Sequence, residues 1–101
     1  MTILHLALAT DWDAARATGD YRVSTLGRTL DQEGFIHCSH DHDQLRGVQA
    51  GYYGHVTAPL VVLEIDPTGL DVRVEGGFPH VYGPIPLQAV TAVHPYEPTT
   101  R

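Results

Sequence analysis

The chain has 101 residues, with twelve Asp or Glu against six Lys or Arg, so its formal net charge is −6 with neutral histidines. This length predicts a single domain, residues 1–101, and the acidic balance excludes broad binding to nucleic-acid backbones, which needs a basic surface. No apolar run approaches the roughly 20 residues that span a membrane. Met1 leads directly into a strand pattern without a basic secretion signal, so we expect a cytoplasmic protein. Its oligomeric state stays open.

The first element predicted is a strand over residues 2–9, because apolar side chains alternate there. Leu4, Leu6 and Leu8 share one face. His5 falls in the middle of the strand on the opposite face, where we expect it to reach a pocket.

A short helix is predicted over residues 11–18. Asp11 is a suitable N-cap, and Gly19 suits the left-handed position that ends a helix. Trp12 is expected to pack inward. A short extended piece should follow, and then a polar, irregular loop over residues 25–33.

A second helix is predicted after residue 40, capped by Asp41. Leu45, Val48 and Tyr52 fall at the spacing of one helical stripe, which we expect to be buried. Gly54 should end the helix.

The C-terminal half reads mainly as strands. Residues 60–65 form a buried strand, and residues 72–75 form one with a wet face. Residues 87–93 should form the last strand, after one helical turn, followed by a polar tail over residues 95–101. Two helices against about six short strands predict an α+β domain.

Two polar stretches carry the chemistry. In a strand over residues 35–39, period-2 alternation places Phe35, His37 and Ser39 on one face and Cys38 on the other, buried one. A buried thiol is usually inert, so Cys38 is a poor nucleophile.

The second stretch repeats this arrangement, with Phe78, His80 and Tyr82 on one face and Val81 on the other. Two segments that each offer an aromatic ring, a His and a hydroxyl suggest two walls of one pocket. Prolines at positions 79, 84 and 86 disfavour a central paired strand over the whole length of this stretch, so a rigid, partly extended segment is expected.

The ordinary alternative is that each His is a half-buried sheet residue bonded to a backbone carbonyl, and that Glu75 and Arg22 are surface charges. A metal site is disfavoured, because the His and Cys residues within positions 37–42 lack the paired spacing of four converging ligands. The predicted pocket is built from His5, His37, Ser39, His80 and Tyr82, with Arg22, Ser24, Glu75 and Phe78 as further contributors.

These motifs resemble the family called domain of unknown function 952. The resemblance covers nearly the whole chain. It is carried by the opening Leu4-His5-Leu6-Ala7, by Trp12, by Tyr21-Arg22 with Ser24, by Gly34-Phe35-Ile36-His37-Cys38-Ser39, by Leu63-Glu64-Ile65-Asp66 and by Phe78-Pro79-His80-Val81-Tyr82-Gly83-Pro84.

That family is distantly similar to the ADP-ribosyltransferase superfamily, which includes NAD-using RNA 2′-phosphotransferases and poly-ADP-ribose polymerases. The resemblance implies compact, strongly twisted small sheets that bind NAD in a cleft. His5 matches the superfamily's first-strand position, and His37 with Ser39 matches the second. Glu75 or His80 would stand at the third, although the usual triad is not reproduced cleanly.

Three functions remain open on the sequence. The first is an ADP-ribosyl or glycosyl transferase that uses NAD or a related nucleotide, with His37, His80 and Glu75 as catalytic residues. The second is a small-ligand-binding module without turnover. The third is a His-dependent metal hydrolase.

Overall fold

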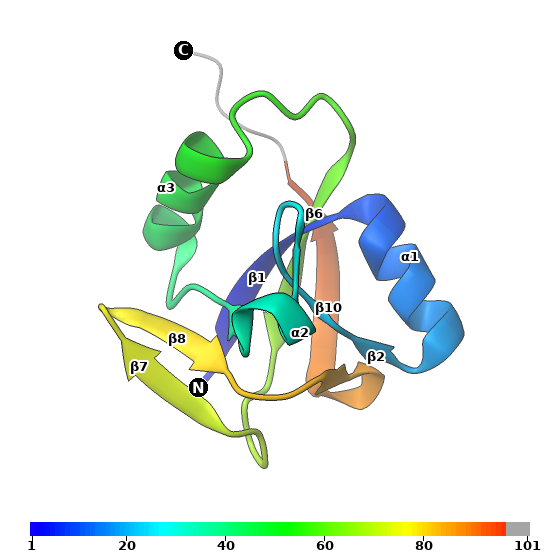
Figure 1. The fold of residues 1–101 in the computed structure, drawn as a ribbon, viewed down its shortest axis with the longest axis vertical. Coiled ribbons are helices and arrows are strands. Elements are labelled where there is room, and N and C mark those ends of the chain that lie inside the picture. Colours follow the sequence, from blue (N-terminus) through cyan, green and yellow to red (C-terminus); the bar gives the residue numbers. More distant parts are fainter. Residues whose placement is uncertain (97–101) are drawn as a thin grey trace.

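The structure, a computed structural model, describes residues 1–96. It is an α+β fold of several small antiparallel sheets with short helices around them, as the sequence predicts (Figure 1). Most of the predicted tail, residues 97–101, lies outside the described residues. None of the helices within residues 1–96 is long and apolar enough to cross a membrane.

The central sheet has the order β1-β6-β10 and is antiparallel throughout. Its middle strand β6 is an almost continuous apolar run, which suits a strand covered on both faces. The helical turn predicted before the last strand is a short 3-10 helix, η1. The bounds are β1 Ile3–Leu8, β6 Leu60–Ile65, η1 Leu87–Ala89 and β10 Val90–Pro95.

The core lies on both sides of this sheet, and α1 and α3 flank it from opposite sides (Figure 1). Leu4 and Leu6 pack against α3, whereas Ile3 and Ala7 face the core beside α1. Both faces of β1 are therefore buried. His5 points away from the leucines, as predicted, toward the core beside α1. Its side chain is therefore buried and does not face an open pocket.

A second sheet, of order β5-β8-β7, carries the polar motifs. The prediction that the prolines disfavour a central paired strand over the whole of residues 78–86 holds in part, because the central strand β8 covers only Phe78–Val81 and includes Pro79. The backbone N–H and C=O of a strand residue point to the same side, and the Pro79 carbonyl accepts from the Cys38 N–H of the β5 segment. The N–H that Pro79 lacks would also point toward β5, so the hydrogen bonds between β8 and β7 are unaffected. The bounds are β5 Ile36–His37, β7 Val72–Glu75 and β8 Phe78–Val81.

Helix α1 spans Ala9–Thr18, with Trp12 and Ala15 buried. It begins before Asp11, so the prediction that Asp11 caps it is wrong; the carboxylate instead lies in the first turn, where a negative charge is favourable. Gly19 ends the helix at a φ of 103°, in the left-handed region, as predicted.

Helix α3 spans His42–Tyr52 and is capped by Asp41, whose side chain accepts from the Gln44 N–H, as predicted. Leu45 and Val48 are buried. Tyr52, expected in the same buried stripe, is 61% exposed, because it lies at the end of the helix beyond the sheet that covers the other two.

The prediction of an irregular loop over residues 25–33 is wrong. Thr29 and Gln32 form a reciprocal capping box that nucleates the one-turn helix α2, Leu30–Glu33. A hairpin precedes it, and one further strand pair joins the two halves of the chain. The bounds are β2 Asp20–Tyr21, β3 Val23–Thr25, β4 Arg28–Thr29 and β9 Ile85–Pro86, with β3 paired to β4 and β2 to β9.

The packing predicts which substitutions unfold the domain. Leu63 on β6 is 0% exposed, so Leu63→Ala should destabilise by about 2–5 kcal/mol through lost transfer energy and the cavity left behind. Val74→Ala on β7, where the side chain is 61% exposed, is the control and should change stability by less than about 0.5 kcal/mol. Urea denaturation measures both. Equal effects would contradict the assignment of β6 to the core.

Candidate functional site

A cavity of about 470 Å³ opens beside the second sheet. Its walls come from the β3–β4 hairpin, the end of α2, strand β5, the end of α3 and the β7–β8 hairpin. The lining residues are Ser24, Thr25, Leu26, Arg28, Glu33, Phe35, His37, Tyr52, Glu75, Gly76, Phe78 and His80.

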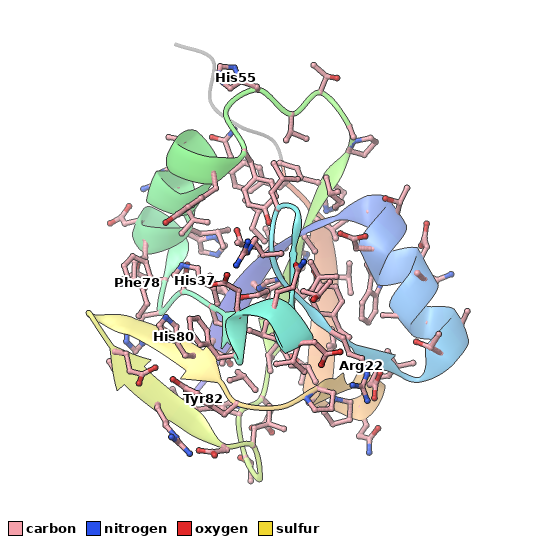
Figure 2. The ribbon with its side chains drawn as sticks, viewed as in Figure 1. Arg22, His37, His55, Phe78, His80 and Tyr82 are labelled. Atoms are coloured by element: carbon pink, nitrogen blue, oxygen red, sulfur yellow. The ribbon has the colours of Figure 1, made fainter. Side chains whose placement is uncertain are left out.

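His37 and His80 are direct neighbours across the β5–β8 pairing, with ring centroids 5.4 Å apart. Figure 2 shows them together with Phe78 between α3 and β8. They thus lie side by side on one sheet and not on two facing walls. Cys38 and Val81, the next residue on each strand, are buried behind them.

Aromatic rings surround the two imidazoles. Phe35 stacks on His80 at a centroid distance of 4.0 Å and an interplanar angle of 11°. Phe78 lies 4.8 Å from His37, and Tyr52 meets the edge of the same imidazole at 6.4 Å. The cavity therefore offers flat apolar surfaces to a ligand, and a planar ring is the shape that matches them best.

Glu75 links His80 to Tyr82. The His80 Nδ1 lies 2.8 Å from Glu75 Oε1, and the Tyr82 hydroxyl donates to the same oxygen. These two hydrogen bonds, first from Tyr82 and then from His80, hold the pKa of Glu75 below its usual range. Because a carboxylate only accepts, His80 Nδ1 carries the hydrogen, and in the neutral ring Nε2 is the acceptor.

Arg73 supports this arrangement from outside the cavity. Its guanidinium lies 4.3 Å from the centre of the Tyr82 ring and is paired with Asp71 at 3.0 Å. Tyr82 is therefore held on both sides, by a cation over its ring and by the Glu75 carboxylate at its hydroxyl.

His37 is fixed through its backbone. Its N–H donates to the Ser24 Oγ at 3.3 Å, and its carbonyl accepts from His5 Nδ1 at 2.6 Å. Burial, and next the proximity of His80, lower the pKa of His37, so its ring is neutral at pH 7. Its Nε2 is buried without a hydrogen-bond partner among the described residues, which costs free energy.

His5 lies beneath the cavity and does not line it. Since its Nδ1–H donates to the His37 carbonyl, its Nε2 must accept, and the donor is the Tyr21 hydroxyl at 3.0 Å. Both side chains are buried, and burial lowers the pKa of His5 to about 4. His5 is thus neutral, and its hydrogen bond to the His37 backbone connects the central sheet to the site and helps to position His37.

The other predicted residues divide into two groups. Ser24 and Phe78 line the cavity, and Tyr82 reaches it through Glu75. Ser39 is buried against β1, where its backbone pairs with Leu4. Arg22 is bonded to Asp20 and lies far from the two imidazoles in Figure 2.

Several lining residues were missed as site residues. Phe35 was signalled by its place two residues before His37 on one strand face. The sequence gives no site signal for Glu33 and Arg28, which are paired at 2.7 Å, because it predicts a loop where the Thr29–Gln32 capping box lies between them. Tyr52 had no sequence signal, because its spacing matched a buried stripe.

A smaller cavity, about 360 Å³, lies on the α3 side and shares His37, Tyr52 and Phe78 with the first. Gln44 lines it and donates through Nε2 to the Gly77 carbonyl, which ties α3 to the β7–β8 turn. Across residues 1–96, no three His, Cys, Asp or Glu side chains converge in a way that could hold a metal ion.

The fold and cavity define a class, a small α+β domain with a His- and aromatic-lined pocket. The chain belongs to the family described as "Protein of unknown function (DUF952)", whose model matches residues 6–93. This confirms the family that the motifs suggest, and the family description assigns no function.

Solved structures of one relative are similar over nearly the whole chain. The crystal structure of protein CC0527 from Caulobacter crescentus has a TM-score of 0.80 at 30% identity, covering 99% of this chain and 90% of that one. A double-mutant crystal form gives 0.77 at 28% identity, with the same coverage. The solution structure gives 0.71 at 26%, covering 98% and 87%. Among curated proteins, none matches the chain.

The buried His5 predicts a pH dependence of stability. An unfolded His takes up a proton near pH 6.5, whereas the folded His5 does so only near pH 4, so stability falls as pH drops through this window. At about 1.4 kcal/mol per pKa unit, His5 should cost about 3 kcal/mol between pH 7 and pH 4. Urea denaturation at several pH values measures this. His5→Gln should flatten the dependence by that amount, and an unchanged slope would contradict the assignment.

Proposed function

We propose that this protein binds NAD or a related nucleotide, with the nicotinamide–ribose end in the larger cavity, in the manner of an ADP-ribosyltransferase. The observation that carries the proposal is the Glu75–His80–Tyr82 network beside rings that can stack on a heterocycle. A cavity of about 470 Å³ falls within the range of about 300–1,000 Å³ of small-ligand sites, and it holds one end of such a ligand.

The proposed chemistry is cleavage of the bond between ribose C1′ and the nicotinamide nitrogen. The nicotinamide leaves with the bonding electron pair, and the sugar acquires oxocarbenium character. The Glu75 carboxylate, held ionised by its hydrogen bonds, stabilises that positive charge. An acceptor hydroxyl then bonds to C1′, and its proton passes to His80 Nε2, whose opposite nitrogen is anchored on Glu75.

A non-catalytic binding module is the second candidate, and one observation favours it. In the ADP-ribosyltransferase resemblance, the first-strand His lines the cleft, whereas His5 is buried and bonded to Tyr21 and His37. A site without that contact would keep the stacking surfaces for a ligand and lack part of the catalytic set. It predicts binding without nicotinamide release.

Catalysis and binding can be separated at Glu75 and His80. Glu75→Gln and His80→Ala should each lower nicotinamide release from labelled NAD about tenfold or more, with a smaller loss of affinity, because their contacts strengthen in the transition state. The control is Glu64→Gln, since Glu64 pairs with His94 at a different cavity.

The expected result is that the native protein and the Glu64→Gln control release nicotinamide at similar rates, and that the Glu75→Gln variant releases it about tenfold or more slowly. Binding of NAD without release by the native protein selects the binding module. A ligand at 100 times its dissociation constant adds about 2.7 kcal/mol to the free energy of unfolding. If a thermal-shift assay finds no stabilisation by NAD, nicotinamide mononucleotide or ADP-ribose, both the transferase and the binding module are excluded.

His37 tests whether the paired imidazoles recognise the ligand. His37→Ala should abolish NAD binding while costing less stability than Leu63→Ala, because the His37 side chain is half-buried and makes no hydrogen bond among the described residues. Calorimetric titration and urea denaturation measure the two effects. If the variant unfolds while the folded fraction still binds, His37 is a structural residue.

A further inference from the structure

The charges that line the larger cavity are mainly negative. Glu33 and Glu75 contribute carboxylates, and within residues 1–96 Arg28 is the cationic side chain in the lining. Arg28 is already paired with Glu33, with Nε 2.7 Å from the carboxylate oxygen. Glu75 accepts hydrogen bonds from Tyr82 and His80 that hold its pKa low, so the lining carries two carboxylates against one arginine.

Within residues 1–96, no arginine beside this cavity is free to bind a phosphate group. The sequence contains no lysine. Arg73, close to Glu75 and Tyr82, is paired with Asp71, and Arg22 and Arg46 are paired with Asp20 and Asp43. Recognition of a phosphate usually relies on such cations, with an Arg free to make two parallel bonds.

The rings of the cavity favour positive charge instead. Phe35, Phe78 and Tyr52 present aromatic surfaces around the two imidazoles. The face of an aromatic ring attracts a cation, and a carboxylate in the same site adds to that attraction. A flat, positively charged heterocycle therefore satisfies both the shape and the charge of this site.

We propose that the cavity selects cationic N-glycosides, compounds whose planar base carries a positive charge on the nitrogen bonded to ribose, and that phosphate groups add nothing to binding. The inference rests on the proposed function and narrows it to a nucleoside-like ligand recognised by its charged ring. Such a base is also a good leaving group, because the electron pair of the broken bond neutralises it.

Three compounds distinguish the contribution of the ring charge to the binding affinity from that of the phosphate. Nicotinamide riboside has the charged ring, its 1,4-dihydro form has the same sugar with a neutral ring, and nicotinamide mononucleotide adds one phosphate. Calorimetric titration of the native protein should give an affinity for nicotinamide riboside about tenfold or more above that for the dihydro form, which corresponds to about 1.4 kcal/mol. The mononucleotide should bind no more tightly than the riboside.

Three variants test which residues cause the preference for the charged ring. Glu75→Gln should reduce the preference for the charged ring, whereas Glu64→Gln, at the separate Glu64–His94 pair, should leave it unchanged. Glu33→Gln should release Arg28 and raise the affinity for the mononucleotide relative to the riboside. Circular dichroism of each variant checks that it is folded.

The outcomes distinguish the two proposals. If NAD binds but the preference for the charged ring is below tenfold, or the mononucleotide binds more tightly than the riboside, this inference is wrong and the proposed function stands. If neither NAD nor any of the three compounds binds, the proposed function fails and this inference fails with it.

Discussion

The antiparallel pairing of β5 with β8 is the constraint on which the candidate site depends. It sets His37 opposite His80, and because side chains alternate along each strand, it places Cys38 and Val81 together in the core behind them. A register change of one residue would bury the imidazoles and expose the apolar pair, so the hydrophobic effect itself holds the site in place.

This sheet is joined to the central one by a buried polar link. The Tyr21 hydroxyl donates to His5, and His5 donates to the backbone of His37. Each buried polar atom in the link has a partner, which avoids the penalty of an unsatisfied group and fixes a single tautomer of His5. The site is therefore tied to the most buried strands of the molecule, and the same burial makes its stability sensitive to acid.

Local signals were sufficient for much of the fold. Alternation predicted β1 and β7, and a continuous apolar run predicted β6. Asp41 predicted the start of α3 and Gly19 the end of α1, because each signal depends on backbone geometry within a few residues. The Thr29–Gln32 capping box was equally local and could have revealed α2. The two motifs that contain His37 and His80 were recognised for the same reason, since period-2 alternation fixes which side chains share a face.

By itself, therefore, the sequence determined the longer elements, the α+β class, the family motifs and the shared face of each motif. Only the tertiary structure decided which strands are neighbours. That choice set the two imidazoles side by side on one sheet, brought Glu75 against His80 and Tyr82, and withdrew His5 into the core. Strand pairing joins residues far apart in the chain, and it is selected by the burial of whole faces, a property of the assembled core that no local pattern contains.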